Sequence, residues 1–257
     1  MMAWERGIVI KSQSELAVMR EAGRINALAL GAVREAIRPG ITTGELDAIA
    51  SEVLRKHNAK PAFLGVRGAY PYPATTTISI NDEMVHGIPG KRKLKEGDIV
   101  SVDCGTILEG FVGDSAFTAG VGEISSEAQH LIEITEQSLY IGIDKLRPGN
   151  RVGDVGAAIQ EFVEGQGYYL TREYTGHGVG RQMWESPQVP NYGTPGRGAL
   201  LRAGMTIALE PMVLIGTART RVLPDQWTVA SADGSLTAHI EHSVAVTENG
   251  PVILTVP

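Results

Sequence analysis

The chain has 257 residues, of which 43% are hydrophobic and 20% are charged, the ordinary balance of a soluble globular protein. Its net charge of -6 argues against general binding to nucleic acid or to anionic membranes. The single cysteine, Cys104, allows no internal disulfide and favours a reducing compartment. The N-terminal segment 1–15 lacks the apolar core of a signal peptide, and no run reaches the roughly 18 apolar residues of a membrane span. These features predict a soluble, cytoplasmic protein.

Helix-like stretches occur in two pairs, and a repeated motif separates the members of each pair. The motif reads RPGITTGEL at 38–46 and RPGNRVGDV at 147–155. Thr42 or Thr43 would cap the helix that opens at the first copy. The predicted helices span, in chain order, roughly 14–37, 43–57, 125–146 and 152–166.

The segment SVDCGTILEGFVGDSA, from 101 to 116, predicts a β-hairpin with its turn at Glu109-Gly110. With a two-residue turn, Asp103 and Asp114 share a face of the hairpin as diagonal neighbours, whereas a three-residue loop would separate them. An ionised carboxylate on a largely buried strand is costly unless another group compensates its charge. The pair therefore raises the question of which cation offsets it.

A second repeat extends the acidic pattern into the other half of the chain. LKEGDIVSVD and LRAGMTIALE each combine Leu, a basic residue and Gly with a β-rich run, and they end on Asp103 and Glu210. Another β-rich run, AHIEHSVAVT, carries Glu241, and GHGVG places His177 between glycines. Singly, such residues are more often strand-edge or backbone-bonding groups, but one imidazole and four carboxylates together suit two divalent cations. The two copies of the first motif begin at 38 and 147, a separation too long for a solenoid unit. The repeat therefore indicates a duplicated α+β half with a pseudo-two-fold axis.

The motifs VDCG…GFVGDSA, GHGVG, ALEPM and IEHSVAVT, preceded by INDEMVHGIP, resemble those of the type I methionine aminopeptidases. The resemblance runs from about residue 10 to the C-terminus and implies the α+β pita-bread fold of the creatinase/aminopeptidase family. That fold has two pseudo-two-fold-related halves, a central antiparallel sheet and helices outside. It implies one catalytic domain over 1–257, with halves at about 10–120 and 121–257. The short spacing between His177 and Glu210 lacks the insertion of the type II enzymes.

The resemblance also implies a role for each acidic or imidazole ligand. Asp103 would bind one ion through both carboxylate oxygens, and Asp114 and Glu241 would bridge two ions. His177 and Glu210 would complete the second ion. Water activated by the ions would be the nucleophile, and Glu210 would act as general base. Co, Mn, Fe and Zn all suit such ligands.

Other residues match substrate-facing positions of the same family. His86, in MVHGIP, would lie near the scissile amide nitrogen and hydrogen-bond to it or transfer a proton. Tyr72, with Tyr70 as the alternative, would match a pocket tyrosine, and Trp227 would either wall the methionine pocket or pack in the core. The remaining candidates for substrate binding are Thr77, Met183 and Trp184.

Departures from the family pattern also gather at the substrate-facing positions. A second active-site histidine would stand seven residues after His177, where this chain has Trp184. Val66-Arg67 replaces a Tyr-His pair, with about three extra residues nearby. An indole can donate one hydrogen bond but cannot become cationic. Because the metal-ligand pattern is complete, the changes indicate a specialised enzyme rather than a decayed one.

Three functions are consistent with this pattern. The first is a dinuclear aminopeptidase that removes N-terminal methionine from peptides and nascent proteins with a small second residue. The second is a metallohydrolase of the same fold with another N-terminal residue or substrate, and the third is a non-catalytic binding protein. For the first function we expect a monomer that meets peptide N-termini, with the ribosome as a further partner and no nucleic-acid or membrane partner.

Overall fold

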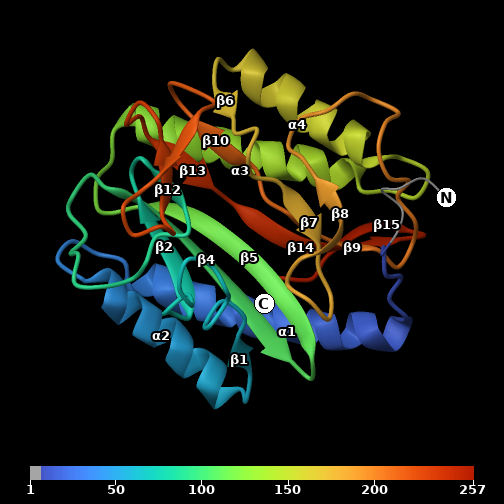
Figure 1. Ribbon diagram of the computed structural model, residues 1–257, viewed down its shortest axis with the longest axis horizontal. Helices are drawn as coiled ribbons and strands as arrows, with labels where there is room; N and C mark the ends of the chain where they lie inside the picture. Colours follow the sequence, from blue (N-terminus) through green and yellow to red (C-terminus); the bar gives the residue numbers. More distant parts are fainter. Residues whose placement is uncertain (1–6) are drawn as a thin grey trace.

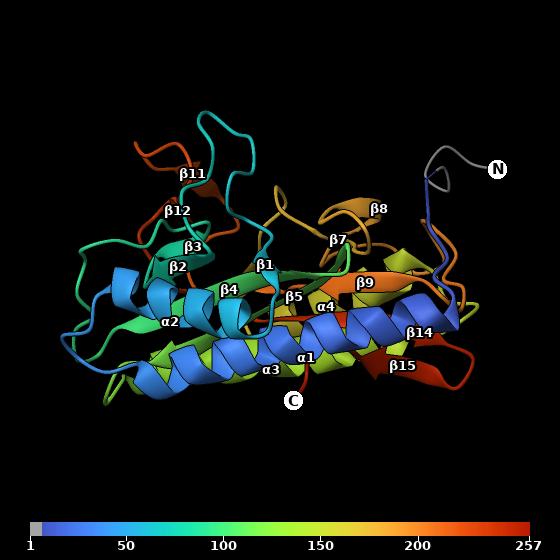
Figure 2. The same cartoon turned by 90° about the horizontal axis from the view of Figure 1, so that it is seen from below.

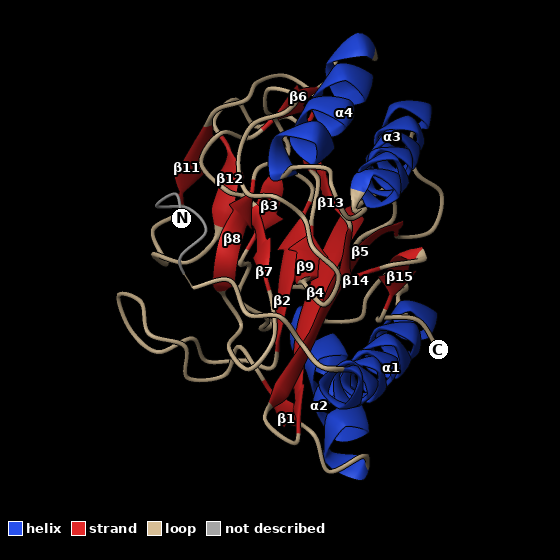
Figure 3. Ribbon diagram, turned by 90° about the vertical axis from the view of Figure 1, so that its right-hand side faces the viewer, coloured by secondary structure: helices blue, strands red, loops and turns tan. Residues whose placement is uncertain are grey.

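Within residues 7–257, which the computed structural model describes, four helices lie on one side of a twisted antiparallel sheet (Figures 1 and 3). Residues 1–6, part of the N-terminal segment in which the sequence predicts no signal peptide, lie outside the described residues. The helices agree with their predicted ranges to within one residue at each end, and Thr42, rather than Thr43, caps the second helix. They are α1 (Gln13–Ala36), α2 (Thr43–Lys56), α3 (Ser126–Lys145) and α4 (Val152–Gly165).

The main sheet has nine strands, in the order β1-β4-β5-β14-β9-β7-β8, with β2 paired to β4 and β15 paired to β14. Two smaller sheets, β13-β10-β6 and β11-β12-β3, lie beside it. The strands are β1 (Lys60–Pro61), β2 (Thr76–Ile80), β3 (Glu83–Val85), β4 (Ile99–Leu108), β5 (Phe111–Gly120), β6 (Tyr169–Leu170), β7 (Gly176–Gly178), β8 (Glu185–Val189), β9 (Thr206–Leu209), β10 (Met212–Leu214), β11 (Thr220–Val222), β12 (Val229–Ser231), β13 (Thr237–His239), β14 (Glu241–Thr247) and β15 (Gly250–Ile253).

Each helix pair covers its own part of the sheet with its own apolar core. The core under α1 and α2 includes Val102 and Cys104 of β4, so the cysteine faces the helices, as its parity predicts. The core under α3 and α4 includes Ile207 and Leu209 of β9 together with Val244 of β14. Figure 2 shows the helices along one side and the loops around β3, β11 and β12 on the other. The helices therefore leave the opposite face of the sheet free of helical cover.

None of the helices in the described part of the chain is long and apolar enough to cross a membrane.

The hairpin of β4 and β5 has the two-residue turn that the sequence predicts. Glu109 and Gly110 have φ of 49° and 78°, as a turn that matches the right-handed twist of the strands requires. The register pairs Asp103 with Ala116 and Gly105 with Asp114. Since paired residues share a face and side chains alternate along a strand, Asp103 and Asp114 lie on the same face.

Helix α1 is fastened to this hairpin by the buried amide of Asn26. Its Nδ2 donates hydrogen bonds to the carbonyl oxygens of Cys104 and Gly113, and its Oδ1 accepts one from the hydroxyl of Ser115 at 2.5 Å. Helix and strand approach so closely that a Cβ on Gly113 would lie 2.6 Å from the backbone nitrogen of Gly23. One side chain of α1 thus bonds to the residue that follows Asp103 and to both residues that flank Asp114.

We expect Asn26→Leu to lower the free energy of unfolding by about 2–4 kcal/mol, because buried carbonyl and hydroxyl groups would lose their partner. Urea denaturation in the presence of EDTA measures this without a contribution from bound metal. Glu35→Leu, at an exposed position of the same helix, is the control and should shift stability by no more than about 0.5 kcal/mol. Equal denaturation midpoints for Asn26→Leu and the wild type would contradict the expectation.

Candidate active site

Adjacent strands bring the predicted ligands to the face of the sheet that the helices leave free. Asp103 of β4 and Glu241 of β14 both lie opposite Ala116 of the strand between them, β5. Asp114 precedes Ala116 by two residues and therefore points to the same side. Three carboxylates from three neighbouring strands thus lie within one patch of the sheet.

The next two strands supply the other two ligands by the same geometry. Leu209 of β9 pairs with His242 of β14, and the two strands are antiparallel. The next residue after Leu209, Glu210, therefore lies beside Glu241. His177 of β7 pairs with Ala208, two residues before Glu210, and therefore shares its face. All five residues that the sequence proposed as metal ligands are brought together by five consecutive strands, β4, β5, β14, β9 and β7.

Short distances join the side chains of this cluster. One ligand atom each from Asp114, His177 and Glu241 lies within 4.8 Å of the other two. Nε2 of His177 is 3.8 Å from Oδ2 of Asp114 and 3.5 Å from Oε1 of Glu210. Such separations leave space for a cation between the groups rather than for direct bonding of every pair.

The carboxylates are buried next to one another with too few hydrogen-bond donors. Burial, followed by mutual repulsion, raises the pKa of Asp103, Asp114 and Glu241 well above the ordinary values. One oxygen of each, Oδ1 of Asp103, Oδ1 of Asp114 and Oε1 of Glu241, is buried without a hydrogen-bond partner among the described residues. Divalent cations would satisfy these oxygens and favour their charged form, so the residues present fit a metal centre.

The tautomer of His177 agrees with a role as metal ligand. Its Nδ1 lies 2.9 Å from the carbonyl oxygen of Gly178, which can only accept a hydrogen bond. Nδ1 therefore carries a proton, and Nε2, which faces the carboxylates of Asp114 and Glu210, is the nitrogen that could bind a cation. A backbone carbonyl behind the ring is a common support for a metal-binding histidine.

A second histidine, His239, lies in the cluster and was not among the sequence-predicted site residues. Its Nε2 is 3.4 Å from Oε2 of Glu210 and 3.9 Å from Oε2 of Glu241. Burial opposes the charged form of His239, but the carboxylate of Glu210 outweighs it and raises the pKa of the imidazole. Its spacing of two residues from Glu241 would predict a common face only on one continuous strand, and the chain passes from β13 to β14 between these residues.

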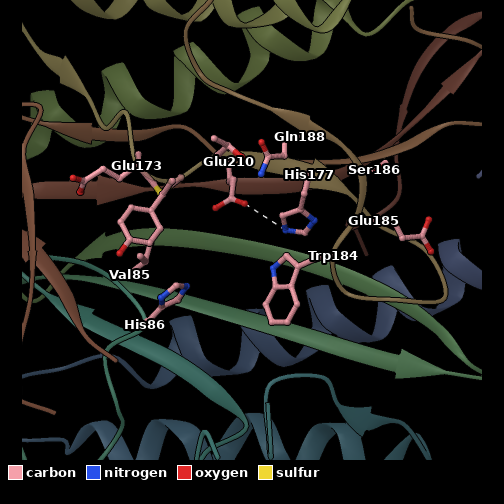
Figure 4. A pocket seen from close by; sticks show the side chains of 12 residues that line it. Val85, His86, Glu173, His177, Trp184, Glu185, Ser186, Gln188 and Glu210 are labelled. Atoms are coloured by element: carbon pink, nitrogen blue, oxygen red, sulfur yellow. Dashed lines mark ion pairs between the residues drawn. The ribbon is translucent and has the colours of Figure 1, made fainter. Parts of the chain in front are cut away.

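A groove of about 490 Å³ opens beside the cluster of carboxylate and histidine side chains, and Figure 4 shows its lining. His177 and Glu210 enter from the sheet, while His86 and Trp184 enter from opposite sides of the groove. The other lining residues are Val85, Glu173, Tyr174, Thr175, Glu185, Ser186, Gln188 and Met212.

A narrow apolar cavity of about 60 Å³ adjoins the groove, with His86 and Trp184 as shared walls. Tyr72 lies in this cavity wall, its hydroxyl donating to the carbonyl oxygen of Gly87 at 2.9 Å, whereas Tyr70 is 38% exposed and bonds to the carbonyl of Asp225. The remaining lining residues are Phe63, Val66, Thr77 and Trp227.

Strained backbone presents His86 at the junction of groove and cavity. The residue has a φ of 62°, and a Cβ on the following Gly87 would lie 2.2 Å from the carbonyl oxygen of Ile78. Burial lowers the pKa of His86 to about 4, against the raising effect of Glu210, so its ring is neutral at pH 7. A neutral imidazole there can donate one hydrogen bond and accept another.

The other substrate-facing candidates lie in three places: the cavity wall, the exposed rim and the apolar core behind the cavity. Trp227 lines the cavity and also packs edge-on against Tyr72 at 5.1 Å between ring centroids. Trp184 is 53% exposed, with its ring centroid 6.4 Å from that of His177. Met183 is buried in the apolar cluster with Phe63, so it lies among the residues that support the cavity.

Residues 17–248 match the sequence profile of metallopeptidase family M24. A methionine aminopeptidase from Clostridium perfringens is 50% identical over 248 residues, which cover 96% of this chain and 98% of that protein. Methionine aminopeptidase 1 from Bacillus subtilis is 47% identical, over 96% of this chain and 99% of that protein. The crystal structure of a methionine aminopeptidase from Thermotoga maritima, 47% identical, superposes with a TM-score of 0.94 over 97% of this chain and 100% of that one.

These similarities confirm the resemblance that the motifs carry, and they confirm the pita-bread fold, with its curled antiparallel sheet and outer helices. The metal-binding character of the family agrees with the buried group of Asp114, His177 and Glu241. The chain belongs to metallopeptidase family M24.

Proposed function

We propose that this protein is a methionine aminopeptidase that uses two divalent metal ions to remove methionine from the N-termini of peptides. The observation that carries the proposal is that Glu210 and His177 of the acidic cluster line a groove beside a narrow apolar cavity. The similarity to methionine aminopeptidases over nearly the whole chain supports the choice of substrate.

Asp103, Asp114, Glu241, His177 and Glu210 would hold the ions. Bound there, divalent cations would polarise the peptide carbonyl and make water a nucleophile at neutral pH. Glu210 and His177 are the members of the set that line the groove, and Glu210 is the carboxylate of the two, which suits it to accept a proton from water as general base. His86, neutral and at the junction with the apolar cavity, would hydrogen-bond to the amide that is cleaved.

The walls of the cavity account for the substrate side chain. Phe63, Tyr72 and Trp227 leave a slender apolar space, which an unbranched thioether would fill more readily than a bulky branched side chain. A methionine seated there would direct its free amine toward the acidic cluster. We further propose that the substrates are peptides and nascent chains in the cytoplasm with a small second residue, that the ribosome is a further partner, and that the enzyme acts as a monomer.

A second candidate, an aminopeptidase of the same fold for a different N-terminal residue, is supported by two walls of the cavity. Val66 and Trp184, which replace other residues of the family pattern, both line it. They change the shape of the pocket, so they bear on which side chain enters it.

Asp114→Asn should reduce peptidase activity by more than about 100-fold, since even the residues that support metal ligands are typically worth 10–100-fold. Chelation of the wild type should have an effect at least as large, and restored divalent metal should reverse it only in the wild type. Circular dichroism checks that the fold survives. Asp144→Asn, at an exposed surface pair with Arg147, is the matched control and should remain active. Full turnover by rigorously metal-free wild type would rule out the mechanism.

Peptides that begin Met-Ala should be cleaved, and N-acetylated versions of the same peptides should not. The reason is that acetylation removes the positive charge that faces the acidic cluster and adds bulk at the floor of the groove. Chromatography of the released residue, for a panel of peptides that differ in their first residue and in acetylation, measures both the need for a free amine and the preference for Met. Comparable cleavage of the acetylated peptide would contradict the placement of the amine. Efficient release of another residue, with Met peptides inert, would favour the second candidate.

Trp184→His should raise kcat on Met-Ala peptides more than it changes KM. A histidine at this rim position could donate a hydrogen bond to the substrate carbonyl as negative charge develops, a contact typically worth on the order of 10²–10³ in rate. The comparison is made at matched metal occupancy. If Trp184 only packs at the rim, the substitution will leave kcat unchanged or lower it.

A further inference from the structure

We infer that His239 is a positioning residue of the metal centre, whose imidazole Nε2–H holds the carboxylate of Glu210 in its metal-binding orientation. The inference rests on the proposed metal centre and adds to it a residue outside the predicted ligand set. His239 does not line the groove, so its effect is exerted through Glu210 rather than on the substrate.

The backbone of His239 is fixed on both sides. Its N–H donates to Oγ1 of Thr118 at 3.0 Å, and its carbonyl oxygen accepts from the same hydroxyl at 2.8 Å. The residue ends β13, where it pairs with Met212 of β10, and it is only 2% exposed. A side chain on such a rigid and buried backbone has little freedom to turn away from the cluster.

The ring nitrogen that faces the cluster is unpaired. Nε2 of His239 is buried and has no hydrogen-bond partner among the described residues, although Oε2 of Glu210 lies only 3.4 Å away. A buried polar nitrogen without a partner is destabilising, so the site gains stability when the contact closes. A small rotation of the Glu210 carboxylate is enough to turn this approach into a hydrogen bond of ordinary length.

Glu210 is the ligand most in need of such support. Its side chain is 14% exposed, against 3% for Asp114 and 2% for Glu241, because it borders the open groove. Oε1 faces Nε2 of His177 at 3.5 Å, and Oε2 faces His239. A donor on the Oε2 side would therefore leave Oε1 as the oxygen free to face a cation held beside His177.

The test compares His239→Leu and His239→Gln with the wild type by calorimetric titration of Co²⁺ into the metal-free proteins, together with the visible absorption of the bound Co²⁺. A leucine fills the space without a donor, whereas a glutamine amide can place an N–H near the position of Nε2. His242→Gln is the matched control, because His242 points away from the cluster with its Nδ1 2.8 Å from Oγ1 of Thr255.

We expect His239→Leu to weaken Co²⁺ binding at the site that includes Glu210 by about 10–100-fold, to alter the Co²⁺ spectrum and to lower kcat with little change in KM. His239→Gln should restore most of the affinity and kcat, and His242→Gln should behave as the wild type.

Unchanged affinity and spectrum in His239→Leu would overturn the inference while leaving the metal centre intact. An equal loss in His239→Gln would also overturn it, because an imidazole that itself ligates the metal cannot be replaced by an amide. Failure of the wild type to bind Co²⁺ would instead refute the proposed function.

Discussion

Like charge buried on one face of the sheet is the constraint on which the rest of this structure depends. Asp103, Asp114 and Glu241 lie side by side in a low-dielectric site where their repulsion is strong and donors are few. Only a rigid frame holds such groups together in the absence of a cation. The frame is the register of five adjacent strands, and the amide of Asn26 fixes the hairpin from behind. The cluster is thus a preformed cation site that the fold keeps under electrostatic strain.

The parts of the fold that follow from local periodicity could be predicted. The four helices have apolar stripes, and α1, α2 and α3 begin at side-chain caps. The turn at Glu109-Gly110 fixes the parity of Asp103 and Asp114, so their common face follows from the sequence. The cavity wall could not be derived in this way, because the loop that carries Tyr70 and Tyr72 has no period to say which tyrosine turns inward. Its hydrogen bonds, which are tertiary, decide it.

His239 was missed for a different reason. It lies two residues before Glu241, but the chain changes sheets between them: β13 pairs with β10, and β14 pairs with β9. The alternation of side chains is a property of one continuous strand, so it does not by itself predict the facing of residues across a break at Ile240. Thr118 restores the alignment by bonding the backbone of His239, and this contact is visible only in three dimensions.

Trp184 and His239, two side chains near the cluster, differ in what they can reach. Trp184 stands at the open rim, 53% exposed, where a side chain can touch a bound peptide. His239 is 2% exposed on the far side of Glu210, so a peptide in the groove cannot contact it. An imidazole behind the cluster therefore cannot replace a basic group missing at the rim. Metal ions held by the cluster would then have to stabilise the negative charge that develops on the substrate, which would make the orientation of Glu210 more consequential in this chain than it would be with a histidine at the rim.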